Sequence, residues 1–299
     1  NQYTVQFVLN GGNFTEGNKE NPISVPSGTE VVLKNYQPER SGYEFGGWYY
    51  DNAFTQPVDD SGIVTPSQSN TTSDTLTLYA KWEVASYPSF TELKAAIADA
   101  SAPIHVAGNI EISETLTIGS TTTLIADATT TFTRATGFTG ALFKNSADFT
   151  LQGSENAIIT IDGNDIEAEA PAIKSTANLT VTYCNFENNT NKATDGGAIF
   201  VETTETMNFS ASNCNFTNNK VTVSVTAGGA VAIDGSKVNS TITKSKFINN
   251  LAENNGGGAL YISGSSTTNY LHTISDSQFN DNKTEAYSTN YGGAIYLSQ

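Results

Sequence analysis

Apolar residues occupy every second position in a series of short segments from about residue 172 to the last part of the chain. Four of these segments follow a Gly-Gly-Ala triplet, and their apolar pairs are Ile199 and Val201, Val231 and Ile233, Leu260 and Ile262, and Ile295 and Leu297. A period of two is typical of a β-strand with one buried face. Since no helical pattern extends over roughly ten residues here, we predict short strands joined by turns.

Two phrases recur four times in the same region. In the first, an asparagine follows a phenylalanine by three positions, and successive copies lie 30, 31 and 32 residues apart: Phe186 and Asn189, Phe216 and Asn219, Phe247 and Asn250, Phe279 and Asn282. The second is the Gly-Gly-Ala triplet, which begins at Gly196, Gly228, Gly257 and Gly292. Self-similarity at roughly 20–50 residues is typical of stacked units that cannot bury their apolar faces alone. The predicted fold class is therefore mostly all-β, with a right-handed parallel β-helix in which each turn is termed a rung.

Stacking in register gives each repeated residue a structural role. We predict that the four phenylalanines form a ladder, and that the four asparagines form a second ladder at a bend, each amide bonding to its copy in the next rung. Asparagine also tolerates the left-handed backbone that a tight bend requires, and the paired glycines indicate a second bend. The segments Lys220 to Ala227 and Thr284 to Tyr291 are predicted to loop out from one side of the stack.

Other parts of the chain precede the repeats of residues 172–299. Residues 1–83 alternate as strands with many aromatic residues, which predicts a small β module, and residues 84–89 are predicted to be a linker. Residues 104–171 indicate irregular early rungs without the repeated phrases, in the segments 104–106, 110–112, 116–118, 123–125, 141–143, 149–151 and 158–161. The stack is expected to be truncated at its C-terminal end.

Residues 90–100 are predicted to form a helix, capped at its N-terminus by Ser89 or Thr91. Its apolar positions lie on one face: Phe90, Leu93, Ala96 and Ile97. A solenoid needs its open end covered, because exposed strand edges pair with other chains. We therefore predict that this helix caps the β-helix.

Several sequence motifs of the first unit resemble those of a known family. The phrases are Tyr3-Thr-Val-x-Phe7, Asn10-Gly-Gly12, Ser41-Gly-Tyr43-x-Phe45-x-Gly47-Trp48-Tyr49 and Leu76-x-Leu78-Tyr79-Ala80-Lys81-Trp82. They are similar to the Listeria/Bacteroides repeat, the B-repeat of internalin-type surface proteins. The resemblance implies a β-grasp-like fold that serves as a spacer or accessory module on bacterial surface proteins. Trp48 and Trp82 are predicted to be core residues.

The paired phrases Phe-x-x-Asn and Gly-Gly-Ala-Ile/Leu/Val resemble the repeat of the chlamydial polymorphic outer-membrane proteins, over roughly residues 172–299. This resemblance implies a β-helical, surface-exposed and adhesin-like segment, without naming a ligand. We expect an extracellular location at a bacterial cell surface, with the signal peptide and anchor outside this sequence.

The charge of the chain narrows the classes of possible binding partner. The chain has 30 acidic and 14 basic residues and a formal net charge of −16, which disfavours nucleic acid and anionic membranes. The chain contains no long apolar run, so no direct membrane insertion is expected.

Cys184 and Cys214 occupy the same repeat column and are predicted to be buried free thiols. A disulfide between adjacent rungs is the less favoured alternative.

One candidate binding surface lies on the strands that follow the Gly-Gly-Ala triplets. The outward positions there include Phe200, Tyr261 and Tyr296, which would form an aromatic strip onto which sugar rings stack. The alternative is that loops partly bury the strip.

Glu202 and Asp234 are weak catalytic candidates, because they occupy equivalent outward positions one rung apart, near the separation of about 5 Å in retaining glycosidases. No lysine or arginine accompanies them in the sequence pattern, and the next residues of their column are Ser263 and Ser298. His105 and His272 stand singly in different rungs. The favoured interpretation is ordinary exposed acids.

No cofactor and no metal site is predicted, although Asp162, Asn164 and Asp165 could contribute to a structural calcium loop. The function expected from the sequence is a non-catalytic, adhesin-like surface protein whose β-helix binds a host protein or a glycan. The alternatives are a pure stalk or spacer and a β-helical polysaccharide lyase or glycoside hydrolase. The oligomeric state is left open.

Overall fold

The computed structural model describes residues 1–14, 19–40, 42–67, 69–99, 103–222, 227–253, 256–263, 270–285 and 292–298. It contains two compact units, Asn1–Ala85 and Ser86–Gln299, and each unit has its own hydrophobic core. The loop predicted at Lys220 to Ala227 and the one at Thr284 to Tyr291 lie largely outside the described residues.

The first unit is a small mixed β module. Its four-stranded sheet has the order β2 (Ile23–Pro26), β1 (Gln2–Val8), β6 (Thr75–Val84) and β4 (Tyr43–Tyr49). The central strands β1 and β6 are parallel, and each outer strand pairs antiparallel with its neighbour. A short antiparallel pair, β3 (Val31–Val32) and β5 (Ile63–Val64), and the 3-10 turn η1 (Leu33–Tyr36) complete the described part of the unit.

Alternate residues of the central strands build the core of this module. Val5 and Phe7 of β1 and Leu78 of β6 are fully buried, as the period of two in these strands predicts. Trp48 is only 5% exposed, and the indole of Trp82 packs against the same core while its Nε1 donates a hydrogen bond to the Leu9 carbonyl at 2.8 Å. The structure therefore places both tryptophans in the packing roles that the sequence predicts.

The boundary between the two units is sharper than the predicted linker of residues 84–89. Strand β6 continues to Val84, which pairs with Tyr43, and β7 (Ser86–Tyr87) already pairs in parallel with a strand of the second unit. Pro88 separates β7 from the helix cap at Ser89. Residues 86–89 therefore belong to the β-helix unit.

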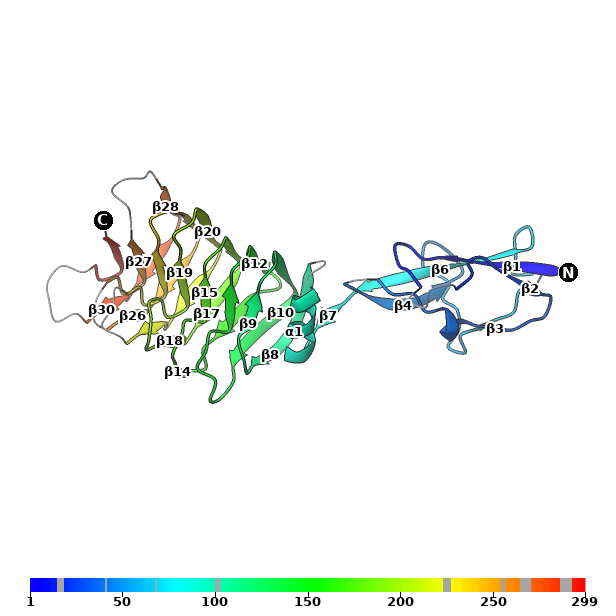
Figure 1. Ribbon diagram of the computed structural model, residues 1–299, viewed down its shortest axis with the longest axis horizontal. Helices are drawn as coiled ribbons and strands as arrows, with labels where there is room; N and C mark the ends of the chain where they lie inside the picture. The colour runs from blue at the N-terminus through cyan, green and yellow to red at the C-terminus, as the bar shows by residue number, and fades with distance from the viewer. Residues whose placement is uncertain are drawn as a thin grey trace. The chain divides into compact units, whose positions relative to one another are not determined.

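The helix α1 (Phe90–Asp99) covers the first rungs, as predicted (Figure 1). Of the two proposed caps, Ser89 is the one used: its hydroxyl accepts a hydrogen bond from the Glu92 backbone N–H and donates one to the Glu92 carboxylate. Leu93 and Ile97 are buried in the β-helix core, and Phe90 and Ala96 pack against it. The apolar face of the helix thus closes one end of the core.

The second unit is a parallel β-helix, since all its strand ladders are parallel (Figure 1). One 13-stranded sheet contains β7, β8 (Ile104–Ile112), β10 (Thr122–Arg134), β12 (Phe149–Gln152), β13 (Ile159–Asp162), β16 (Leu179–Thr182), β17 (Cys184–Glu187), β20 (Met207–Ser212), β21 (Asn215–Thr217), β24 (Val238–Thr243), β25 (Lys246–Ile248), β28 (His272–Ser275) and β29 (Gln278–Asn280). A seven-stranded sheet contains β9 (Leu116–Ile118), β11 (Phe143–Asn145), β15 (Ile173–Ser175), β19 (Ile199–Glu202), β23 (Val231–Asp234), β27 (Leu260–Ser263) and β31 (Ile295–Ser298). A five-stranded sheet contains β14 (Glu167–Ala168), β18 (Thr190–Asn191), β22 (Lys220–Val221), β26 (Leu251–Ala252) and β30 (Lys283–Thr284).

The two phrases of the repeat align from rung to rung. Phe186, Phe216, Phe247 and Phe279 stack face to face, with ring centroids 4.6–4.8 Å apart and interplanar angles of 3–7°. This distance equals the spacing of neighbouring strands, so the ring stack follows directly from the in-register pairing. The predicted core ladder of phenylalanines is confirmed.

The predicted asparagine ladder also forms. Each side-chain amide donates to the side-chain oxygen of the next rung, at 2.9 Å from Asn189 to Asn219, 3.0 Å from Asn219 to Asn250 and 2.9 Å from Asn250 to Asn282. One part of the prediction is wrong, because the left-handed residue of this bend is the preceding one, with φ of 54° at Asn188. The ladder residues themselves are needed for their buried amides, not for their backbone conformation.

The paired glycines are required by close approach of the backbone. A Cβ atom at Gly197 would lie 2.3 Å from the Gly229 carbonyl oxygen, and one at Gly229 would lie 2.0 Å from the Gly258 carbonyl oxygen. Only glycine fits where stacked turns come this close. The bend predicted at the Gly-Gly pairs is therefore real, and close approach is its dominant cause.

The early rungs differ from the predicted set of short strands. The segments 104–106 and 110–112 are parts of one strand, β8, and segment 123–125 is the start of β10, which continues to Arg134. Residues 127–131 are mostly polar, so they interrupt the apolar alternation. The second half of β10 therefore could not be predicted from that alternation. The register between β8 and β10 shifts between Ala126 and Thr130, as at a β-bulge.

Candidate functional site

The predicted aromatic strip is buried. Phe200 is 5% exposed and Tyr261 is 4% exposed, and together with Ala232 they form a small apolar cluster that is separate from the main core. Tyr296 is partly buried against this cluster, with its ring centroid 6.0 Å from that of Tyr261. The prediction of an exposed platform is wrong, and the alternative of burial holds.

The turns before these strands explain the burial. The Gly-Gly segments fold back over the strands that follow them, so that a Cβ atom at Gly228 would lie 1.9 Å from the Val231 carbonyl and 2.7 Å from the Tyr261 backbone nitrogen. A strand face that looks outward in the repeat pattern is thus covered by its own connection. Phe200 and Tyr261 therefore offer no open face to a sugar ring, and Tyr296 is partly buried beside them.

Glu202 and Asp234 do lie together. Glu202 is the last residue of β19 and Asp234 is the last residue of β23, and the two are direct neighbours in the parallel ladder. Both border an open cavity of about 580 Å³, referred to below as the acidic cavity, which is lined by Thr176, Glu202, Thr203, Thr204, Glu205, Asp234, Gly235 and Ser236. The turns that follow the two strands therefore build a polar hollow at this side of the stack.

A lysine accompanies the acidic pair, contrary to the prediction from the sequence pattern. The Lys174 ammonium forms an ion pair with the Glu202 carboxylate at 3.0 Å. Lys174 is paired in register with Phe200, not with Glu202, so its long side chain reaches across to the end of the next strand. Aligning the repeats predicts contacts only between residues at equivalent positions. It therefore does not predict a contact between residues at different positions of neighbouring strands.

Residues of the following turn complete the acidic cavity. The Glu205 backbone N–H donates to the Thr203 hydroxyl at 3.0 Å, which fixes a tight turn and places the exposed Glu205 side chain on the cavity wall. Its side chains are carboxylates and hydroxyls, and none of the described lining residues is aromatic. This chemistry suits hydroxyl groups and cationic groups of a ligand. Sequence reasoning missed Thr203 to Glu205, although they directly follow Glu202.

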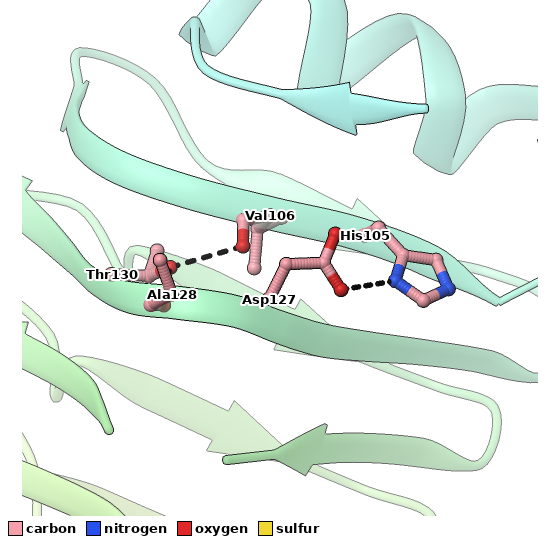
Figure 2. A network of polar contacts seen from close by, with 5 residues as sticks. All are labelled: His105, Val106, Asp127, Ala128 and Thr130. Atoms are coloured by element: carbon pink, nitrogen blue, oxygen red, sulfur yellow. Dashed lines mark hydrogen bonds and ion pairs between the residues drawn. The ribbon is translucent and has the colours of Figure 1, made fainter. Parts of the chain in front are cut away.

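Each histidine has a polar partner. His105 Nδ1 lies 2.7 Å from Asp127 Oδ1, and Figure 2 shows this pair bridging β8 and β10 beside the register shift. In the same network the Thr130 hydroxyl lies 3.1 Å from the Val106 carbonyl oxygen (Figure 2). His272 Nδ1 lies 2.8 Å from the Ser240 hydroxyl, and burial lowers the pKa of His272. The histidines thus hold strands together and do not stand singly.

The candidate calcium segment forms a turn. The Asp162 carboxylate accepts hydrogen bonds from the Asn164 backbone N–H at 2.9 Å and from the Asn188 amide at 3.3 Å. Asn164 and Asp165 both have positive φ, at 55° and 52°. Within the described residues, no group of three or more histidine, cysteine, aspartate or glutamate side chains is arranged to hold a metal ion. Asp162 is engaged in organising the turn itself.

The acid pair Asp162 and Glu187 predicts a pH-dependent stability. These residues are neighbours in the parallel ladder, and partial burial, followed by the nearby Asp162 charge, raises the pKa of Glu187. A carboxyl whose folded-state pKa is raised destabilises the fold when ionised, and stability falls as pH rises from the unfolded pKa of about 4.3 through the raised value. Glu187→Gln is expected to stabilise the protein at pH 7 by roughly 0.5 kcal/mol, since solvent screens the exposed part of the side chain.

Denaturant unfolding of both proteins at pH 7 and at about pH 3.5, below the unfolded pKa, measures this effect. The gain should vanish at the lower pH, where Glu187 is protonated in both states. A gain of equal size at both values would show that the charge is not its cause.

Cys184 and Cys214 are buried free thiols, as predicted. Their Sγ atoms lie 3.4 Å and 3.2 Å from the carbonyl oxygens of Thr182 and Ser212, two residues earlier on the same stretch of chain. Burial raises the pKa of the Cys184 thiol well above its usual range. These thiols act as small core residues.

Comparison with known proteins matches both ends of the chain. Residues 3–81 match the Listeria-Bacteroides repeat domain, and residues 276–298 match the Chlamydia polymorphic membrane protein repeat. The first match covers the β module, and the second covers the last of the four repeats described above. The chain therefore carries the two kinds of repeat that its sequence motifs indicate. These repeats suggest a surface- or membrane-associated repeat protein.

Two proteins of Evansella cellulosilytica are similar over 87 residues. One is named "Putative Gly-rich membrane protein" and is 33% identical, and the other is named "Putative membrane protein" and is 31% identical. The aligned part is 29% of this chain in both cases, and it covers 9% and 11% of those relatives, so the chain spans about a tenth of their length. No solved structure matches. No helix within the described part of the chain is long and apolar enough to cross a bilayer.

Proposed function

We propose that this protein is a non-catalytic, adhesin-like protein of the bacterial cell surface, and that its β-helix binds a host or microbial glycan in the acidic cavity. The acidic cavity itself carries the proposal: it is the place where the repeat strands bring carboxylates and hydroxyls from two adjacent rungs into one open hollow. The membrane-protein names of the two relatives and the surface character of both repeat families support the location.

The chemistry of the acidic cavity selects the kind of glycan. Carboxylate oxygens accept hydrogen bonds from sugar hydroxyls or from an amino group, and they repel acidic sugars. The net charge of −16 also repels acidic sugars from the protein surface as a whole. The preferred ligand is therefore a neutral or amino-substituted glycan.

A glycan array probed with the full chain tests this function. The double variant Glu202→Gln, Asp234→Asn keeps the shape of the cavity and removes two charges, and it should bind at least tenfold more weakly, because charge-assisted hydrogen bonds are replaced by neutral ones. The matched control is Glu111→Gln, Glu167→Gln, which removes the same charge from exposed positions of β8 and β14 and should bind like the parent protein. Equal loss in both double variants would contradict a site at the acidic cavity.

A glycoside hydrolase is the second candidate, and the ladder pairing of Glu202 with Asp234 favours it, because adjacent rungs place carboxylates near the separation used by retaining enzymes. Prolonged incubation of the bound glycan distinguishes the two. New reducing ends that the Glu202→Gln, Asp234→Asn variant does not produce would identify an enzyme and overturn the proposal. Absence of binding to every glycan and host protein tested would leave a structural spacer.

A further inference from the structure

Two cavities adjoin in the β module beside the 3-10 turn η1. The larger has about 400 Å³ and is lined by Phe14, Lys19, Lys34, Gln37, Pro38, Glu39 and Phe45. The smaller has about 190 Å³ and lies against Trp48, Val58 and Asp59. Lys34, Gln37 and Phe45 line both cavities, and the two adjoining cavities are together termed the module pocket. Together they have the size of a site for one or two sugar or amino-acid residues.

The module pocket concentrates the positive charge of an acidic unit. Residues 1–83 contain ten acidic and four basic side chains, and two of the four basic ones, Lys19 and Lys34, line the larger cavity. Three of the four also have contacts within the module: Arg40 stacks on the Tyr43 ring at 3.9 Å, Lys81 forms an ion pair with Glu83 at 2.9 Å, and the Lys19 ammonium lies 5.4 Å from the centre of the Tyr36 ring. The exposed Lys34 ammonium has no carboxylate partner among the described residues.

Two aromatic side chains, Phe45 and Trp48, line the module pocket beside the lysines. Phe45 packs edge-on against Trp48 with ring centroids 5.3 Å apart, and Phe45 lines both cavities. The Trp48 indole N–H is buried and has no hydrogen-bond partner among the described residues, whereas the Trp82 N–H is bonded to the Leu9 carbonyl. The two indole N–H groups therefore differ in their surroundings, and only Trp48 lines the smaller cavity.

We propose that the module pocket binds a sugar that carries a carboxylate. Lys34, together with Lys19 of the larger cavity, would meet the carboxylate, and Phe45 would contact the apolar edge of the sugar ring. Glu39 lines the larger cavity and Asp59 lines the smaller one, and their carboxylate oxygens would accept hydrogen bonds from sugar hydroxyls. A ligand that offers both a carboxylate and several hydroxyl donors matches this mixture better than a purely anionic one.

An acidic peptide is disfavoured by the state of the nearest sheet edge. Extended peptides bind by adding a strand to an open edge, and β4 is the edge strand beside the module pocket. Its outer side is already occupied, because the Val58 N–H donates to the Trp48 carbonyl at 2.9 Å and the Tyr50 N–H donates to the Gln56 carbonyl at 2.9 Å. Strand addition at this place would first require removal of residues 56–58.

The two tryptophans make a direct test possible in the full chain. They are the only tryptophans of the protein, and both lie in the first unit, so a ¹⁵N-labelled sample shows two indole N–H signals. Titration with sodium glucuronate should move the Trp48 signal and leave the hydrogen-bonded Trp82 signal in place. Added salt should weaken the effect, because the carboxylate contact is exposed to screening.

The Lys34→Gln variant should bind glucuronate about tenfold more weakly, as expected for loss of a charge-assisted hydrogen bond. The matched control Lys81→Gln removes the same charge from the same module outside the pocket and should bind normally. Equal shifts with glucose, an unchanged Lys34→Gln variant, or shifts only with an oligo-glutamate peptide would each overturn the proposal. The result is independent of the acidic cavity, since the Glu202→Gln, Asp234→Asn variant leaves the module pocket intact.

Discussion

Asn219→Ala is expected to lower the free energy of unfolding of the β-helix by about 3 kcal/mol. The Asn219 side chain is fully buried and accepts hydrogen bonds from the backbone N–H and the amide of Asn189, while it donates to the Phe186 carbonyl and to Asn250. Its removal leaves the Asn189 N–H and the Phe186 carbonyl short of a buried partner. Each such group costs about 1–3 kcal/mol when it stays unpaired.

The two units can be followed separately in this experiment. Both tryptophans lie in the β module, so tryptophan fluorescence reports that module, while far-ultraviolet circular dichroism reports mainly the larger β-helix. Denaturant should unfold the Asn219→Ala β-helix earlier and leave the fluorescence midpoint unchanged.

Asn215→Ala is the matched control for Asn219→Ala. It removes a half-buried amide from the same rung, and the bond that this amide donates among the described residues goes to its neighbour Asn185, at 2.9 Å. It should cost no more than about 0.5 kcal/mol. A similar loss in both variants would show that burial of the ladder does not determine its contribution.

Most of the β-helix could be predicted because stacking converts a sequence column into a spatial column. Phe216 and Asn219 recur at the same places in four rungs, and in-register pairing leaves each only one kind of neighbour, its own copy. The rungs before the repeats were harder to predict. In β10 a polar run lies within a strand, and the strand is held by pairing with β8 on one side and with β12 and β13 on the other. No local pattern marks such a strand.

The candidate site was predicted less well, because it depends on contacts that cross the columns. Glu202 and Asp234 share a column and were found from the repeat. Lys174 reaches Glu202 from another column, and the Gly-Gly turn that covers Phe200 comes from the chain before the strand. Strand periodicity gives the direction of a side chain, but it does not tell whether a connection lies over it. The module pocket is likewise set by how η1 packs beside β4, which the short strands around it do not encode.

Gly229→Ala is expected to destabilise the β-helix by about 4 kcal/mol, the largest effect of any single substitution considered. Its new Cβ atom would lie 2.0 Å from the Gly258 carbonyl oxygen and 2.7 Å from the backbone of Leu251. All of these atoms belong to the main chain, so no side-chain rotation can relieve the overlap. The rungs would have to separate where the Gly229 N–H donates to the Gly257 carbonyl and the Gly197 N–H donates to the Gly229 carbonyl.

Gly119→Ala separates this overlap from the general effect of replacing a glycine. Gly119 is exposed, and a Cβ atom there would meet no atom within 4 Å, so its replacement should change the stability by less than about 0.5 kcal/mol. The same denaturant series, followed by circular dichroism, measures both variants. If Gly229→Ala proved as harmless as Gly119→Ala, the stacked turns could not be as close as the structure has them. Because Gly197, Gly229 and Gly258 stack on one another, a large loss at Gly229 would mean that the glycines of the Gly-Gly-Ala phrase keep successive rungs in contact.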